Sequence, residues 1–434
     1  MKPTAIARIL RHQYLQGGLR STYWGAAAVA RELRALFPTH NQAFRGEVIR
    51  SHWRFAAAMP QPVRGETRER ARAAVHWLLQ AQAASPDDGV SLGYFPCDID
   101  DDQDKVNAGW RASYPETTGY IITSLLAFAA QFDDPVAAAA AMRMAMWETV
   151  VQMPSGAVQG GPVCPPERQT AATFNTGMVL DGWCSAYRYS ADPTLLAAAR
   201  QAADFLVNDL DEQGYFKTNG AFVSVGEIKT YTCLCAWSIY RFGELAQDDA
   251  YKRMAVWIVE AALRQQRHNG WFAHNCLTHS EAPLTHTIGY TLQGILEVGA
   301  LAGRSDFIEA VRRSLDAILP RMASNGYLPG RFYADWEPAG FSSCLTGSAQ
   351  IAIVAYRLFE LSGEESYRIQ ADKLLDFLKA LQLRQSDDAA VVGALAGSFP
   401  LFGSYMRAAY PNWATKYFLD ALLLQQRLEH VAQS

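Results

Sequence analysis

A repeat of nearly sixty residues constrains the fold of this 434-residue chain more than any other feature. Six apolar segments of similar length each begin with a short knot of small and polar residues. The knots are Tyr114-Pro-Glu-Thr-Thr-Gly119, Phe174-Asn-Thr-Gly177, Lys229-Thr-Tyr-Thr232, Leu284-Thr-His-Thr-Ile-Gly289, Cys344-Leu-Thr-Gly347 and Tyr410-Pro-Asn-Trp413. Gly119 and Gly177 are 58 residues apart, as are Gly289 and Gly347. Self-similarity at such a period indicates a repeat architecture of stacked supersecondary units.

Between the knots lie six segments with helical spacing and more charge. They are Arg68–Gln82, Val136–Gln152, Thr194–Leu210, Asp248–Gln266, Asp306–Met322 and Glu365–Gln382. Their apolar residues recur three or four positions apart, which predicts amphipathic helices with one buried face. The segments after the knots, such as 177–189 and 289–302, are apolar nearly all round, which predicts helices enclosed by neighbours. The chain therefore alternates outer and inner helices.

Most outer segments end in a glycine followed by aromatic residues. These turns are Gly93-Tyr-Phe95, Gly214-Tyr-Phe216, Gly270-Trp-Phe272, Gly326-Tyr-Leu328 and Gly397-Ser-Phe399. Glycine permits the left-handed backbone that ends a helix. β-Branched runs of the kind that form parallel strands are absent between the helices.

The sequence therefore predicts an all-α protein, an (α/α)6 toroid over residues 61–434, because six helix pairs with apolar inner helices bury those helices best by closing into a double ring. Residues 1–60 are expected to form an N-terminal helical extension that packs on the ring, with helices over Pro3–Gln16, Ala26–Phe37 and Asn41–Met59. No Pro/Ser-rich linker separates this extension from the repeats.

Composition excludes several classes of partner. The formal net charge is −4, and no run of five like charges occurs, so neither nucleic acid nor an anionic membrane surface is indicated. No segment is apolar enough to cross a bilayer, and the arginine-rich start is unlike a signal peptide. The seven cysteines are scattered without zinc-ligand spacing. We expect a cytoplasmic protein without a cofactor.

In such a ring all inner helices begin at one end, so the loops before them converge on one mouth, the expected site. The helix starts direct free N–H groups and positive dipole ends there, which favours anionic substituents. We predict Glu116, His286, Asp335, Tyr290 and Tyr231 as catalytic residues, because carboxyl, imidazole and phenol groups are suited to general acid and base catalysis.

The same loops supply aromatic, cationic and amide side chains, the types that stack on sugar rings and bind hydroxyl or carboxylate groups. The predicted substrate-binding residues are Trp110, Arg111, Tyr114, Asn175, His274, His279, Arg331, Tyr333, Trp336, Tyr405, Asn412 and Trp413.

Three alternatives remain open at the level of sequence. Glu116 could simply cap the helix that Pro115 begins. A metal site could form from His274, Cys276 and His279, although their spacing matches no established ligand pattern, and we predict no metal. The run Asp98-Ile-Asp-Asp101-Asp102 contains Asp-x-Asp-Asp but is crowded with charge, which is typical of a solvated acidic loop.

The repeat and the inner-helix starts around Tyr114-Pro-Glu-Thr-Thr-Gly119, Phe174-Asn-Thr-Gly177, Leu284-Thr-His-Thr-Ile-Gly289, Leu345-Thr-Gly347 and Tyr410-Pro-Asn-Trp413 resemble those of the six-hairpin, glycosidase-like α/α-toroid proteins. The resemblance covers about residues 65–425. This superfamily includes unsaturated glucuronyl hydrolases, polysaccharide lyases, sugar epimerases and, more distantly, terpene and lanthionine cyclases. It is specific for architecture and weak for reaction, since one fold hosts many chemistries.

The resemblance implies an enzyme acting on an oligo- or polysaccharide that contains uronic acid. A lyase or epimerase would use a His/Tyr pair drawn from His286, Tyr290 and Tyr231, with Arg331 or Asn175 on the carboxylate. A hydrolase would use two carboxylates, and Glu116 and Asp335 are the expected pair.

Two rival functions follow from the same resemblance. A terpenoid-type cyclase would use Asp101 as its acid, and a non-catalytic toroid would bind carbohydrate only. A lanthionine cyclase is excluded, because the adjacent Cys-His pair typical of its zinc site does not occur in this chain.

Overall fold

The computed structural model describes residues 59–100, 105–220, 223–224, 226–401, 403 and 405–433. The N-terminal helices expected up to residue 58 lie outside the described residues, so the extension and its boundary at residue 60 stay predictions. No helix among the described residues is long and apolar enough to cross a membrane.

Six outer helices form where the amphipathic segments predict them. They are α3 (Thr67–Ala83), α5 (Pro135–Val151), α7 (Pro193–Asn208), α9 (Asp249–Leu263), α11 (Ser305–Ile318) and α13 (Glu365–Leu381). α5, α7 and α9 begin at aspartate N-caps whose side chains accept backbone N–H groups of the first turn. A short 3₁₀ segment, η3 (Leu319–Arg321), extends α11.

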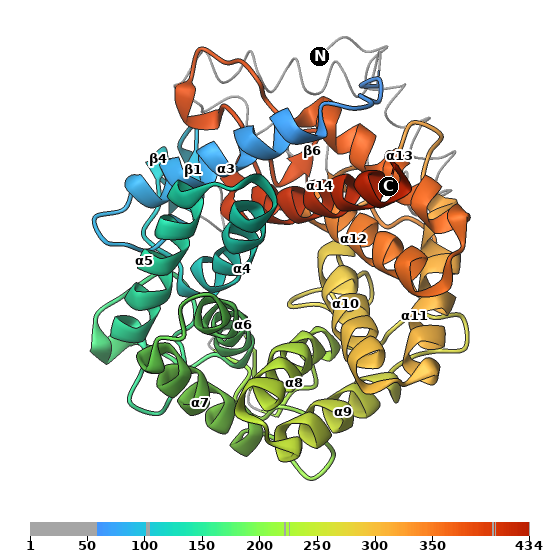
Figure 1. Ribbon diagram of the computed structural model, residues 1–434. Helices are drawn as coiled ribbons and strands as arrows, with labels where there is room; N and C mark the ends of the chain where they lie inside the picture. The colour runs from blue at the N-terminus through green and yellow to red at the C-terminus, as the bar shows by residue number, and fades with distance from the viewer. Residues whose placement is uncertain are drawn as a thin grey trace.

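Six inner helices follow the knots. They are α4 (Pro115–Phe132), α6 (Thr173–Ser190), α8 (Cys235–Ala246), α10 (Thr285–Ala302), α12 (Leu345–Ser362) and α14 (Asn412–Gln433), with the 3₁₀ turn η2 (Thr230–Leu234) before α8. Each packs against the next inner helix, and α14 packs against α4, which closes the inner ring (Figure 1). The fold is the predicted all-α (α/α)6 toroid.

The glycines that mark the repeat lie where two inner helices touch. A Cβ atom at Gly119 would lie 2.5 Å from the backbone of Val179 in α6. One at Gly347 would lie 2.5 Å from the backbone nitrogen of His286 in α10. A side chain at either position would force neighbouring helices apart, so the repeated glycine sets the spacing of the inner ring.

The turn glycines were predicted correctly at three of five places. Gly214, Gly270 and Gly326 have φ angles of +84°, +83° and +89°. The prediction was wrong for Gly93, which lies in the strand β1 (Gly93–Phe95), and for Gly397, which precedes β6 (Ser398–Phe399). Gly156 and Gly393, at φ +85° and +92°, occupy the left-handed position instead. Both follow an outer helix without an aromatic neighbour, so the aromatic criterion missed them.

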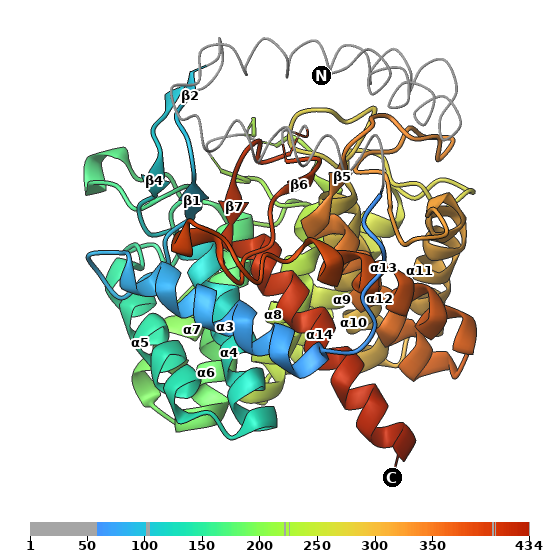
Figure 2. The ribbon, with the colours of Figure 1, turned by 90° about the horizontal axis from the view of Figure 1, so that it is seen from above.

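Short pairings join neighbouring loops around the end of the ring where inner helices begin. Strand β1 pairs with β4 (Gly109–Trp110) and with β7 (Tyr410–Pro411), which joins the first loop to the last. Strand β5 (Ser343–Cys344) pairs with β6, and Leu284 pairs with Arg331. Figure 2 shows these strands gathered at one end of the helices. The pairing fixes the loops that carry the candidate site.

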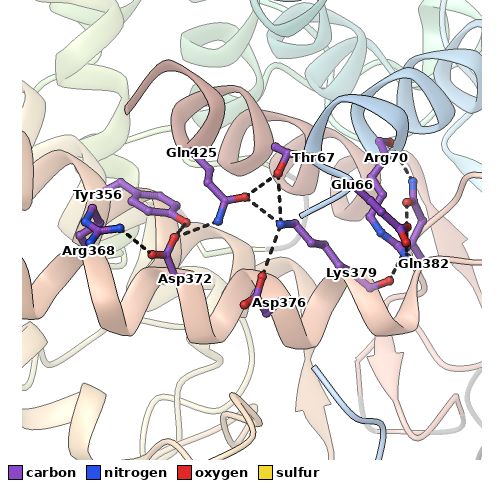
Figure 3. Close-up of polar contacts among 10 residues, drawn as sticks. All are labelled: Glu66, Thr67, Arg70, Tyr356, Arg368, Asp372, Asp376, Lys379, Gln382 and Gln425. Carbon is purple, nitrogen blue, oxygen red and sulfur yellow. Dashed lines mark hydrogen bonds and ion pairs between the residues drawn. The ribbon is translucent and has the colours of Figure 1, made fainter. Parts of the chain in front are cut away.

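A buried polar network closes the ring between its first and last helices (Figure 3). Lys379 of α13 is fully buried, and its Nζ donates to Gln425 of α14 (2.8 Å) and to Thr67 of α3 (3.2 Å). It also pairs with Asp376 at 3.3 Å. Burial lowers the pKa of Lys379 and raises that of Asp376. The lysine therefore holds three helices that come from opposite ends of the described chain.

Candidate functional site

Glu116 lies in the first turn of α4, and its side chain does not cap this helix. No side chain caps this helix by a hydrogen bond, and Glu116 Oε2 instead accepts the Tyr114 hydroxyl at 2.9 Å. Burial raises the pKa of Glu116 to about 7, and the hydrogen bond from Tyr114 opposes part of that shift. The residue as a whole is partly exposed, while its carboxyl group is buried. Glu116 is thus a carboxylic acid that holds or releases a proton near neutral pH.

His286, in the first turn of α10, is held by Gln350 of α12. Its Nδ1 lies 2.7 Å from the amide oxygen Oε1 of Gln350. That oxygen only accepts, so the proton lies on Nδ1 and the lone pair on Nε2. Burial lowers the pKa of His286 to about 4, which leaves the ring neutral at pH 7. The residue is therefore a fixed, neutral base.

Aromatic rings pack around His286. Its ring centroid lies 4.3 Å from that of Tyr290, 5.3 Å from that of Tyr405 and 6.3 Å from that of Tyr417. Tyr120 packs against Tyr417 at 5.6 Å. Burial raises the pKa of all four phenols, so each remains a hydroxyl donor at neutral pH.

Two contacts extend this group around the ring. Phe174 of α6 packs on Tyr290 at 4.6 Å and on Tyr231 of η2 at 5.5 Å. Trp413 of α14 donates its Nε1–H to the Tyr405 hydroxyl at 2.8 Å, and its ring lies 6.2 Å from that of Tyr114. The set lies on all inner helices except α8, where η2 takes its place. We call the following set the ring cluster: Tyr114, Glu116, Tyr120, Phe174, Asn175, Tyr231, His286, Tyr290, Gln350, Tyr405, Trp413 and Tyr417.

The ammonium group of Lys416 lies against two aromatic rings of the ring cluster. Lys416 Nζ is 3.9 Å from the ring centroid of Tyr417 and 4.7 Å from that of Tyr120, and it pairs with Asp420 at 2.8 Å. Burial places this ammonium against two aromatic faces, which strengthens the cation–π attraction. The ring cluster is therefore bordered on this side by a positive charge whose partner carboxylate lies one turn further along α14.

Some polar atoms around the ring cluster lack partners. The Tyr120 hydroxyl, Gln350 Nε2 and, on the same face of α10 as His286, Gln293 Oε1 are buried without a hydrogen bond among the described residues. A buried polar group without a partner is costly, by about 1–3 kcal/mol. These donors and acceptors are available to a polar ligand or to water.

Eight of the residues predicted from sequence lie in the ring cluster: Tyr114, Glu116, Asn175, Tyr231, His286, Tyr290, Tyr405 and Trp413. Asn175 joins it through a side-chain hydrogen bond with Tyr114; burial raises the pKa of Tyr114, and this bond opposes part of the rise. The Asn175 Nδ2 donates to the carbonyl of Gln159 at 2.9 Å.

The structure does not bring Asp335 to Glu116. Asp335 is exposed, and with Tyr333 it lines a separate surface cavity on the loop after η3. The adjacent Trp336 is buried, and its indole N–H donates to the carbonyl of Asn269. The expected pairing of Glu116 with Asp335 is therefore not found, because the bond from Trp336 to Asn269 holds this loop against the turn after α9.

His274 and His279, in the loop before α10, and Arg331 are not part of the ring cluster. His274 and His279 are exposed, and His279 lies 3.9 Å from Glu281. Arg331 donates to the carbonyl of Ala282 at 2.8 Å, which ties two loops together. No group of three or more His, Cys, Asp or Glu side chains in the described ranges could hold a metal ion.

Three further predicted binding residues contribute to the framework. Trp110 packs on Trp77 at 5.5 Å, and Arg111 lies over Phe95. Asn412 is fully buried and donates to the carbonyl of Ser91 (2.8 Å) and to the hydroxyl of Thr117 (2.7 Å). Of the acidic run, Asp98 is exposed and accepts the backbone N–H of Ala108, whereas residues 101–104 lie outside the described residues.

Tyr120, Phe174, Tyr417 and Gln350 belong to the ring cluster but were missed from sequence. Phe174 directly precedes the predicted Asn175. Tyr120 lies four residues after Glu116, and Tyr417 lies four after Trp413. This is the same spacing as from His286 to Tyr290, so extending each helix start by one turn on the same face would have found them. Gln350 carries no such signal, because it approaches His286 from another helix.

No protein-family model and no curated protein matches the sequence. Solved structures do match its fold. An unsaturated glucuronyl hydrolase specific for heparin is 15% identical, with a TM-score of 0.65, over 84% of this chain and 98% of that one. The chain has the fold of the unsaturated glucuronyl hydrolases.

Two further relatives of this fold come from named organisms. The enzyme of Bacillus sp. GL1, described as responsible for the degradation of glycosaminoglycan, is 17% identical, with a TM-score of 0.64, over 84% of this chain and 97% of that one. The enzyme of Streptococcus agalactiae is 13% identical, with a TM-score of 0.59, over 83% and 91%. A mutant of the latter has been solved in complex with dGlcA-GalNAc6S.

Proposed function

We propose that this protein is a carbohydrate-active enzyme that hydrolyses an oligosaccharide ending in an unsaturated uronic acid, with Glu116 as the general acid. The observation that carries the proposal is the buried carboxyl of Glu116, whose pKa of about 7 keeps much of it protonated near neutral pH. It accepts the Tyr114 hydroxyl, and the same ring cluster holds a neutral imidazole on an inner helix whose start favours anions.

The number of carboxyl groups favours this substrate over a saturated glycoside. Hydrolysis of a saturated glycoside ordinarily needs two carboxyl groups, about 5 Å or about 6.5–9.5 Å apart. Glu116 is the carboxyl group of the ring cluster, and the neighbouring carboxylates Asp420 and Asp181 are held in ion pairs with Lys416 and Arg241. An unsaturated uronate is an enol ether, so one proton donor is sufficient to start its hydrolysis.

The ring cluster supplies the proton donor and the base that this hydrolysis requires. Glu116 gives its proton to C4 of the C4=C5 double bond, and the positive charge is shared between C5 and the ring oxygen. A water molecule adds its oxygen to C5 and gives a proton to a base, for which His286 Nε2 and the Glu116 carboxylate are the candidates. The hemiketal opens by breaking its C5–O5 bond, with the hydroxyl proton moving to O5, which leaves a ketone at C5 and a hemiacetal at C1. The hemiacetal then breaks its C1–O glycosidic bond, giving an aldehyde at C1 and the adjoining sugar with a free hydroxyl.

Aromatic side chains and the N-termini of the inner helices support binding of the sugar. Trp413, Tyr405 and Tyr231 offer faces to the C–H surfaces of a pyranose and hydroxyl or indole groups to its oxygens. The N-termini of the inner helices favour the uronate carboxylate.

A second candidate is a lyase or epimerase acting on a saturated uronate. It is favoured by the hydrogen bond from His286 Nδ1 to Gln350, which leaves Nε2 free to abstract the proton α to the carboxylate. A neighbouring protonated tyrosine, Tyr290 or Tyr405, would act as the acid.

Ultraviolet absorbance of the unsaturated uronate tests both candidates. With a heparin or chondroitin disaccharide that ends in an unsaturated uronate, the proposal predicts falling absorbance, and Glu116→Gln should abolish the fall. A rise with saturated uronate polymers would identify a lyase instead. Sugar binding without turnover, unchanged in Glu116→Gln and His286→Ala, would identify a non-catalytic toroid.

A further inference from the structure

A second cavity lies outside the ring cluster, at the same end of the toroid. It has a volume of about 810 Å³ and lies between the turn after α9 and the loop after η3. The lining residues are Arg267, His268, Asn269, Trp271, Glu281, Tyr333, Ala334 and Asp335. None of them belongs to the ring cluster.

The loop that borders this cavity is held in a strained conformation. Trp336 has a φ angle of +62°, which is unusual for a bulky residue. Its indole N–H donates to the carbonyl of Asn269 at 2.9 Å, and the Asn269 amide donates to the carbonyl of Ala334 at 2.8 Å. These bonds fix the turn that presents Tyr333 and Asp335. Backbone strain that the surroundings enforce in this way is concentrated at functional sites.

The cavity also contains an unsatisfied donor. Trp271 is 3% exposed, and its indole N–H has no hydrogen-bond acceptor among the described residues. The Arg267 guanidinium lies over the indole, 4.7 Å from the ring centroid. A buried indole N–H usually has a partner. The site is therefore built from aromatic surface, a donor without an acceptor, and side chains that bind hydroxyl groups.

We propose that this cavity is a second saccharide-binding site that takes an uncharged sugar unit. Tyr333 offers aromatic surface for C–H stacking, and Asp335 and Glu281 offer acceptors for hydroxyl groups. The lining carries one arginine, Arg267, against two carboxylates, Glu281 and Asp335, so it disfavours an anionic sugar.

This choice of ligand rests on the proposed function, because both sites would hold parts of one saccharide chain. The ring cluster would take the uronate end, and the second site would hold a neutral unit of a longer chain. The two sites therefore differ in the charge they select, and binding at the second needs no proton donor.

Affinity electrophoresis tests the second site directly. The full-length protein is run in native gels that contain dextran, arabinoxylan, galactomannan or hydroxyethylcellulose. We expect retardation by at least one of these polymers, and an apparent Kd about tenfold higher in Tyr333→Ala and in Asp335→Asn, the effect of losing one stacking or charged hydrogen-bond contact. Tyr189→Ala, which removes an aromatic side chain that is 61% exposed elsewhere, is the matched control and should bind as the wild type does.

Three outcomes overturn the second site: no retardation by any neutral polymer, equal retardation of the Tyr333→Ala, Asp335→Asn and control variants, or retardation only by an anionic polymer such as hyaluronan. Thermal unfolding of each variant establishes that it is folded. Glu116→Gln should lose catalysis but keep the retardation. Activity retained in this variant would contradict the proposed function alone, whereas absent retardation of the wild type would contradict the second site alone.

Discussion

Replacing Glu116 by glutamine should make the protein more stable at alkaline pH while it removes activity. The folded-state pKa of Glu116 is about 7, above the ordinary glutamate value of 4.5. The folded protein therefore binds this proton more tightly than the unfolded chain does. Its contribution to stability is complete below about pH 4.5 and is lost as pH rises through about 7.

The magnitude follows from the shift. A difference of about 2.5 pKa units corresponds to about 3 kcal/mol, because one unit is about 1.4 kcal/mol. Glutamine has the same shape and never ionises. We expect the stability of Glu116→Gln relative to the wild type to rise by about 3 kcal/mol between about pH 4.5 and about pH 8.

Urea unfolding of both proteins at the two pH values measures this change, and initial rates with the unsaturated disaccharide measure activity. Loss of the general acid should lower kcat/KM by about 10²–10⁴-fold. Glu212→Gln, an exposed carboxylate in the turn after α7, is the control and should show neither effect. A pH-independent stability difference between Glu116→Gln and the wild type would refute the buried, protonated carboxyl.

Three other substitutions test the framework around this acid. Gln350→Leu leaves the His286 Nδ1–H without its acceptor. It should lower the free energy of unfolding by about 1–3 kcal/mol in urea and reduce kcat/KM. A glutamine-to-leucine change at an exposed position should change neither quantity. Gly347→Ala should lower stability by about 1–3 kcal/mol because its Cβ meets the α10 backbone, whereas Gly340→Ala, with open space around the Cβ, should be nearly neutral in the same assay. Lys379→Met should destabilise by about 3–5 kcal/mol and speed amide hydrogen exchange in α3, and unchanged exchange there would contradict its role in ring closure.

The fold could be predicted from sequence because its determinants are local and repeated. The Gly119–Gly177 spacing reflects contacts that recur in successive helix pairs, and the outer helices carry a clear amphipathic period. Gly393 was missed because the last repeat ends without the glycine–aromatic pair.

The sequence predicted site residues best where they lie in or next to the first turn of an inner helix. Glu116 and His286 could be found because they begin inner helices that converge at one end. Gln350 could not, because its role depends on the close approach of α12 to α10. Asp335 was placed wrongly because nothing in the sequence indicates that the strained turn at Trp336 directs its loop outward.

The pH dependence of hydrolysis tests the central claim, that a protonated Glu116 in the ring cluster starts the reaction. Initial rates of absorbance loss are measured with an unsaturated uronate disaccharide between about pH 5 and about pH 9. We predict that kcat/KM falls as pH rises through about 7, where Glu116 loses its proton, and that Glu116→Gln has negligible activity at every pH. A rate that is constant across this range, or hydrolysis retained in Glu116→Gln, would contradict the account.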